Sequence, residues 1–217
     1  MTVSKRKRLR ETQAFRPGEW RAVLAASLKF TDANSPDAAA RRWIPWFCAY
    51  TGARVGEIAQ LRKEDVAKRE GIPSILITPE AGAVKGGRAR VVPLHEHLVA
   101  QGFLKFVSDH TEGPLFYSMA RRLKREDKSE HKKPPYAQVR QRLADWVRSV
   151  GVDDEHVQPN HAWRHTFKQI ANRAGITERT SDYITGHAHK SVGATYGAPT
   201  LEDMAEALKR FPRYAVE

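Results

Sequence analysis

The sequence predicts an α+β fold that is mainly helical, with helices packed around a small antiparallel sheet of about three strands. Two patterns support this prediction. Apolar residues recur at helical spacing over most of the chain, and short β-branched runs occur between Ile72 and Leu94. A chain of 217 residues with 41% hydrophobic residues can bury one sizeable core. We therefore expect a basic tail or linker over residues 1–14 and one folded domain over residues 15–217.

Two helices are expected in the first part of that domain. The first follows Pro17 and places four apolar side chains on one face: Trp20, Val23, Leu24 and Leu28. The second runs from Asp37 to Tyr50, where Pro45 lacks an amide hydrogen and should kink or shorten the helix. Gly52 is a suitable residue to end it.

The expected sheet combines Ile75–Ile77 with Val91–Val92, and Leu115–Phe116 is expected as a short third strand. Helices should follow over residues 95–110, 135–150, 161–174, 177–185 and 201–211, with an exposed loop over residues 121–133. The last of these helices has an apolar face that could pack on its own core or dock on a neighbouring molecule.

Composition favours a polyanionic partner. The formal net charge is +12, from 37 Lys and Arg against 25 Asp and Glu, so nucleic acid is the first candidate. A basic protein with no such partner would have the same composition. The single cysteine, Cys48, cannot form an internal disulfide and is expected to be buried, which suggests a reducing compartment. The sequence has no apolar run near the ~20 residues that span a bilayer.

The first segment whose residues could bind a ligand or take part in a reaction surrounds Arg54. A helix is expected to stop at Gly52, so Arg54 should lie near the N-terminus of the next helix. Backbone amides and a guanidinium can bind one phosphate there, and Glu57, three residues on, can hold the arginine in place. Taken alone, the pair is more typical of an ordinary surface ion pair than of a phosphate site.

A second segment places His161 and Arg164 one helical turn apart, so both could reach one anion. His165 lies four residues after His161, which is a possible metal pair. However, no acidic third ligand is evident. The pair His95 and His97 has the same limitation and is expected to cap a helix at the surface.

The third segment contains Gly186, His187 and Tyr196, with glycines where a helix would break. A tyrosine among small residues is usually a packing residue, so this segment alone indicates no chemistry.

In this order, the segments resemble the catalytic motifs of the tyrosine recombinase (phage integrase) family. Arg54 and Glu57 match its Thr-Gly-x-Arg-x-x-Glu pattern, and Lys85 matches the lysine of a β-hairpin that ends in Val-Pro-Leu. The family's His-x-x-Arg-His-Thr-Phe pattern matches five residues: His161, Arg164, His165, Thr166 and Phe167.

The end of the chain continues the resemblance. His187 follows Gly186 as in the family's Gly-His element, and Tyr196 comes nine positions later. The similarity covers roughly Phe15 to Pro212. The chain departs from the pattern at Ala162 and Trp163, and it has Thr185 where leucine is common. Family members normally carry a helical core-binding domain before this region, and we expect none here because only about 15 residues precede the match.

The resemblance implies that Tyr196 attacks the scissile phosphate, leaving a 3′-phosphotyrosyl DNA and a free 5′-hydroxyl. Arg54 and Arg164 would neutralise the non-bridging oxygens, with Glu57 supporting Arg54.

The remaining three roles follow in the same way. Lys85 would protonate the leaving 5′ oxygen, His161 would assist removal of the tyrosine proton, and His187 would hydrogen-bond the phosphate. Five nearby basic residues are expected to contact mostly the DNA backbone: Arg88, Arg90, Arg121, Lys124 and Lys190.

The implied partner is double-stranded DNA, with no cofactor, no metal and no membrane. Self-association on DNA is also implied, as a tetramer in the active synapse, with the C-terminal helix as a contact. Such a protein would be cytoplasmic, bacterial or phage-encoded, and associated with the nucleoid. Two alternatives are a type IB topoisomerase, which would relax DNA without exchanging strands, and a non-catalytic DNA-binding module, which has no need of Tyr196.

Overall fold

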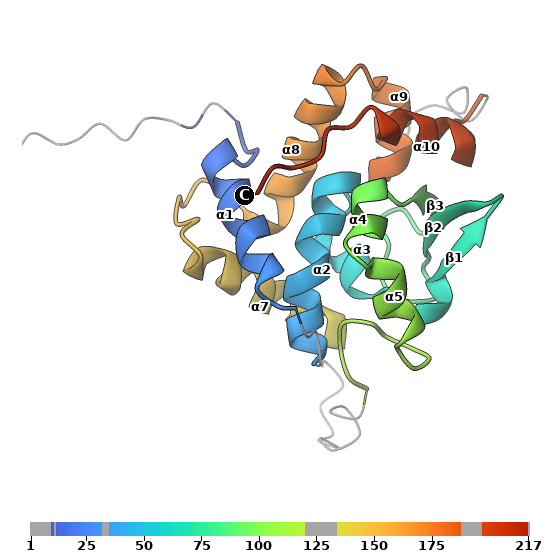
Figure 1. Cartoon of the computed structure of the whole chain (residues 1–217). Coiled ribbons are helices and arrows are strands. Elements are labelled where there is room, and N and C mark those ends of the chain that lie inside the picture. The colour runs from blue at the N-terminus through green and yellow to red at the C-terminus, as the bar shows by residue number, and fades with distance from the viewer. Residues whose placement is uncertain (1–9, 11, 32–34, 120–133, 188–196, 217) are drawn as a thin grey trace, which may run out of the picture.

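The structure is a computed structural model that describes residues 10, 12–31, 35–119, 134–187 and 197–216. The first half contains α1 (Pro17–Leu28), α2 (Pro36–Thr51), α3 (Val55–Ala59), the 3-10 helix η1 (Lys63–Asp65), β1 (Val66–Arg69), β2 (Ile72–Ile77) and β3 (Arg90–Pro93). The second half contains α4 (Glu96–Ala100), α5 (Phe103–Ser108), α7 (Pro135–Ser149), α8 (Pro159–Arg173), α9 (Glu178–Thr185) and α10 (Leu201–Lys209). The expected class, helices around a small antiparallel sheet, is confirmed (Figure 1).

Helix α2 runs through the centre of the molecule, with the sheet at one edge (Figure 1). It begins where the Ser35 side chain accepts a hydrogen bond from the Ala38 amide, and it ends at Gly52 with φ of 58°. The helix continues through Pro45, so the expected shortening was wrong. Burial of the proline ring and of its neighbours Ile44 and Trp46 offsets the missing hydrogen bond.

The three strands form an antiparallel sheet in the order β1-β2-β3. The strand that joins the two predicted strands is β1, Val66–Arg69, so the prediction that Leu115–Phe116 forms a strand of the sheet was wrong. Glu70 and Gly71 both have positive φ, 52° and 77°, which allows a tight turn between β1 and β2. Leu115 and Phe116 are instead buried in the core, and the Leu115 amide donates to the Leu61 carbonyl at 3.0 Å.

The single helix expected over residues 95–110 is two short helices, α4 and α5. Gly102 has φ of 88° between them, a conformation that interrupts a helix and that glycine adopts without strain. The other expected helices agree with the structure, although their ends differ by a few residues.

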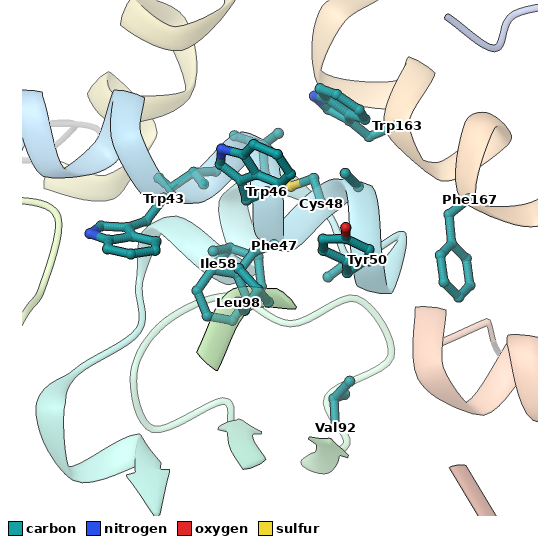
Figure 2. Packing of buried hydrophobic residues seen from close by; sticks show 14 of the residues in the cluster. Trp43, Trp46, Phe47, Cys48, Tyr50, Ile58, Val92, Leu98, Trp163 and Phe167 are labelled. Carbon is teal, nitrogen blue, oxygen red and sulfur yellow. The ribbon is translucent and has the colours of Figure 1, made fainter. Parts of the chain in front are cut away.

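The core forms where α2 packs against α8, with contributions from the sheet and α4 (Figure 2). Trp46, Phe47 and Cys48 of α2 are fully buried, as is Phe167 of α8. This packing fixes the position of the end of α2, which leads to Arg54, relative to the start of α8. None of the helices in the described residues is both long and apolar enough to cross a membrane.

The chain before α1 is attached to the domain through Phe15 and through two residues that we expected in the tail, Arg10 and Ala14. Arg10 pairs with Glu19 at 2.6 Å and with Asp154 at 3.1 Å. Ala14 is buried, and the Phe15 amide donates to the Thr166 hydroxyl at 2.9 Å. The buried guanidinium of Arg10 needs these acidic partners, so its position is specific.

The C-terminal segment is held by two histidines that we expected at the surface. His95 is 2% exposed and its ring stacks on Tyr50, with ring centres 4.0 Å apart. His95 Nδ1 accepts from the His97 amide, so Nε2 carries the proton and donates to the Phe211 carbonyl at 3.0 Å. The Tyr50 hydroxyl lies 2.6 Å from His97 Nδ1 and accepts from the Tyr214 amide. A neutral imidazole at residue 95 therefore suits the folded state.

We predict that His95 makes folding stability pH-dependent. Burial lowers the pKa of His95 below its ordinary value of 6.5, so the unfolded chain takes up this proton at a higher pH than the folded chain. The contribution of His95 to folding stability is fully present above pH 6.5 and is lost as the pH falls below that value. Thermal denaturation between pH 8 and 5 should show a steeper loss for the wild type than for His95→Gln. Parallel curves would contradict the assignment.

Candidate active site

A cavity of about 300 Å³ opens where four parts of the chain meet. They are the start of α3, the loop before β3, α7, and the start of α8. The residues around it include Arg54, Lys85 and His161, three of the six predicted catalytic residues. The fold therefore brings together side chains separated by more than 100 positions in the sequence.

Arg54 immediately precedes α3, and Glu57 in the first turn of that helix holds it. Glu57 Oε1 accepts from Arg54 Nη1 at 2.9 Å, and Oε2 accepts from the Arg54 amide at 3.3 Å. The Arg54 side chain is 23% exposed, whereas that of Glu57 is 2% exposed. The contact orients the guanidinium and leaves part of it accessible beside the cavity.

Glu57 has a second arginine partner, Arg90 at the start of β3, whose Nη2 lies 2.6 Å from Oε2. Burial raises the pKa of Glu57, but Arg90 and Arg54 outweigh it, and the net pKa is lowered. Glu57 is therefore an anion at neutral pH. The Arg90 guanidinium packs inside the site, and its expected contact with DNA stays a prediction.

Arg164 of α8 is buried and makes two contacts with backbone carbonyls. Its Nε donates to the Gly52 carbonyl at 2.8 Å, and its Nη2 donates to the Thr185 carbonyl. Burial lowers its pKa to about 10, so the group remains protonated at neutral pH. Gly52 is required sterically as well, because a Cβ there would lie 2.8 Å from Thr185 and 2.9 Å from Phe167.

His161 and His187 lie on either side of Arg164 in the sequence. Partial burial and then the charge of Arg164 lower the pKa of each imidazole below 6.5, so both are neutral at pH 7. His187 follows Gly186, and its Nδ1 lies 3.3 Å from the Thr185 hydroxyl and 3.5 Å from Asp182. Two neutral imidazoles therefore accompany the arginines.

The residues that depart from the family's pattern have structural explanations. Trp163 packs edge-on against Phe15, with ring centres 4.7 Å apart, and Tyr214 lies on it as well. Thr185 is fully buried, and its carbonyl accepts from Arg90 and Arg164. Neither substitution removes a group from the cavity.

The comparisons with known proteins agree with this geometry. The phage integrase family matches residues 16–202. The chain belongs to that family. Tyrosine recombinase XerD of Vibrio vulnificus, in strains YJ016 and CMCP6, is 25% identical over 153 residues, which cover 67% of this chain and 44% of the relative. The chain therefore spans less than half the length of these curated members of the phage integrase family.

Solved structures show the same fold. An integrase from mycobacterium phage Brujita matches with a TM-score of 0.56 at 21% identity, covering 97% of this chain and 62% of that one. The XerA recombinase matches with a TM-score of 0.54 at 24% identity, covering 97% and 68%. XerH, whose structure is a pre-cleavage complex with its difH substrate, matches with a TM-score of 0.51 at 16% identity, covering 86% and 50%.

Some predicted site residues are not tested by this geometry. Lys85 and Arg88 are exposed on the loop before β3. The proposed nucleophile Tyr196 lies outside the described residues, as do Arg121, Lys124 and Lys190. The roles of Lys85 and Tyr196 stay predictions that rest on the phage integrase motifs. The expected DNA contacts of Arg88, Arg121, Lys124 and Lys190 stay predictions that rest on their charge and their position near those motifs.

Arg140 and Asp182 are among the residues near the site that were not predicted from the sequence. Arg140 of α7 lines the cavity beside Gly56, where a Cβ would lie 2.9 Å from Arg140 Cδ. Asp182 of α9 pairs with Lys168 and approaches His187. Neither belongs to a recognisable motif, and only the packing of α7 on α3 and of α9 on α8 brings them in. In the described residues, no group of three or more His, Cys, Asp and Glu side chains could hold a metal ion.

We predict that Glu57→Gln destabilises the fold by about 1–3 kcal/mol, because two partly buried guanidinium groups lose their shared anion. The lowered pKa of Glu57 means that its contribution is present above pH 4.5 and is lost at lower pH. Chemical denaturation at pH 7 should detect the loss. Glu206→Gln, which removes an exposed partner of Lys209, serves as the control and should change little. Equal stability of the two variants would contradict the proposed contribution of Glu57 to the free energy of unfolding.

Proposed function

We propose that the chain is the catalytic domain of a site-specific DNA recombinase. It would cleave and rejoin DNA strands by transesterification through a 3′-phosphotyrosyl intermediate on Tyr196. One observation carries this proposal: Arg54, Lys85 and His161 line one cavity, and a buried carboxylate orients Arg54. The charges of Arg54 and Arg164 act on both His161 and His187, so these groups lie in the same region. Family membership supports the reaction class.

The arginines supply the electrostatic part of the reaction. Negative charge builds on the non-bridging oxygens when a phosphodiester is attacked, and fixed guanidinium groups stabilise that charge without reorganising. Arg164 is fixed through both Nε and Nη2, and Arg54 is fixed through Nη1. Each retains other N–H groups that can donate to phosphate.

Proton transfer is assigned to the remaining groups. A neutral imidazole can accept the phenolic proton as Tyr196 attacks, and the lowered pKa of His161 favours that form. Lys85 lines the same cavity and would donate a proton to the leaving 5′ oxygen. His187 would hydrogen-bond a non-bridging oxygen. The free 5′-hydroxyl of another strand then displaces the tyrosine, so the phosphodiester is restored without a nucleotide cofactor.

The proposed partner is double-stranded DNA, with several copies of the chain assembled on it as a tetramer in the active synapse. The DNA-bound structure of XerH supports DNA as the partner. Helix α10 was the expected contact between copies, but its apolar residues Met204, Ala207 and Leu208 are buried within this chain. Helix α10 could contact another copy through that apolar face only if it moved away from the core of its own chain. This function places the protein with the DNA in the cytoplasm, in the nucleoid of a bacterium or phage-infected cell.

We predict that the chain forms a covalent adduct with a nicked suicide DNA substrate, and that Tyr196→Phe abolishes it. A denaturing gel detects the adduct. EDTA should leave its yield unchanged, because the arginines perform the charge neutralisation. An adduct that survives Tyr196→Phe would refute the nucleophile, and loss of the adduct in EDTA would contradict metal-free catalysis. Exchanged junctions among the products indicate recombination, whereas relaxed circles without junctions indicate a topoisomerase.

We also predict that Arg140 binds a DNA phosphate next to the cavity. Arg140→Gln should weaken binding to a duplex and reduce the slope of log affinity against log salt concentration by about 1. Arg142, on the same helix, is the matched control because it faces Asp37 at 3.9 Å and does not line the cavity. Binding measured at several salt concentrations distinguishes the two. Equal effects of both variants would argue against a specific contact.

A further inference from the structure

Arg90 connects three parts of the site that are distant in sequence. It begins β3, directly after the loop that carries Lys85, and it pairs with Ile77 of β2. Its side chain is only 15% exposed. One nitrogen, Nη2, donates to both Glu57 Oε2 at 2.6 Å and the Thr185 carbonyl at 3.3 Å. These contacts hold the guanidinium inside the protein.

Both acceptors of Arg90 are shared with a predicted catalytic arginine. Glu57 uses its other oxygen for Arg54, and the Thr185 carbonyl also accepts from Arg164. Arg90 thus links Glu57, which orients Arg54, to the Thr185 carbonyl, which orients Arg164. Displacement of Arg90 would free both acceptors to move.

The turn that presents His187 is shaped around this guanidinium. Gly186 has φ of 70°, and a Cβ at that position would lie 2.4 Å from Arg90 Cζ. Glycine therefore serves two purposes here: it ends α9 in the left-handed conformation, and it allows Arg90 to lie against the turn. His187 leaves the turn at the next position.

Charge and burial indicate that stability alone does not explain the arrangement. Of three neighbouring guanidinium groups, those of Arg54 and Arg90 pair with the Glu57 carboxylate, whereas that of Arg164 donates to backbone carbonyls, which leaves an excess of positive charge. Arg90 Nε is buried with no hydrogen-bond partner among the described residues. Both features cost stability in the absence of an anion. The dianionic transition state of a phosphodiester matches the excess charge.

We propose that Arg90 is a positioning residue for strand cleavage: it holds Glu57 and the Thr185–His187 turn in register, and so fixes Arg54, Arg164 and His187 around the phosphate. This inference rests on the proposed function, because it specifies how the same site is assembled. It differs from the expectation that Arg90 contacts DNA, and a measurement of DNA affinity decides between the two. Its effect should appear in the rate of cleavage and not in the affinity for DNA.

The test compares Arg90→Gln with the wild type at saturating protein on the nicked suicide substrate. We expect the rate of adduct formation to fall roughly 10- to 100-fold, the range found when outer-shell partners are removed. DNA affinity, measured separately, should stay close to that of the wild type. Arg90→Lys keeps the charge but lacks the fork geometry, so it should recover only part of the rate.

Arg62→Gln is the matched control. Arg62 also pairs with a buried carboxylate three residues away, Asp65 at 2.7 Å, but it does not line the cavity. Its loss should lower thermal stability and leave the adduct rate per folded molecule unchanged. A wild-type rate for Arg90→Gln would overturn the proposal, as would a fall in DNA affinity as large as the fall in rate.

The pH profile separates positioning from general damage. Burial raises the pKa of Glu57, and the charge of Arg90 is the strongest influence lowering it. In Arg90→Gln, cleavage should therefore be lost at a higher pH than in the wild type, and Glu57→Gln should remove that difference. If the wild type forms no adduct, the proposed function fails. The same comparison by thermal denaturation still tests the Arg90–Glu57 link, and an absent shift there would overturn it.

Discussion

The ion pairs of Glu57 are the interaction on which the site geometry depends. Its carboxylate is buried in the first turn of α3, and its two oxygens accept from Arg54 and from Arg90, which is 33 positions further along the chain. A buried carboxylate is tolerated only with such partners, so the anion and the two cations fix one another. Arg164 reaches the same region from α8 through the Thr185 carbonyl. A cationic surface is thus assembled before any anion binds, which is the condition for electrostatic catalysis.

The helical core holds this arrangement in place. The packing of α2 on α8 sets the distance between Gly52 and Arg164, and the close approach of Gly52 to Phe167 and Thr185 leaves no room for a side chain. The two ends of the described chain pack on the same helix, because Trp163 contacts both Phe15 and Tyr214. Stability of the fold and placement of the predicted catalytic groups therefore depend on the same contacts.

The sequence predicted the fold class because helical periodicity and the short β-branched runs are local signals. It missed β1 because a Glu-Gly turn is not a typical hairpin signal, although Glu70 adopts positive φ there. The motifs located Arg54 and Glu57 because their contact spans three residues. The partnership of Glu57 with Arg90 and the entry of Arg140 into the cavity depend on tertiary packing. Charge alone suggested that Arg90 binds DNA, and only its burial points to the internal role that we propose.

The most direct test of this account is a structure of the chain bound to cleaved duplex DNA and vanadate, which mimics the pentacovalent phosphorus of the transition state. We predict that the vanadium bridges the Tyr196 phenol and the 5′ oxygen. Its equatorial oxygens should then accept hydrogen bonds from Arg54 and Arg164, with the Glu57–Arg90 contact unchanged. Vanadate bound away from these two guanidinium groups, or a phenol other than that of Tyr196 at its apex, would contradict the account.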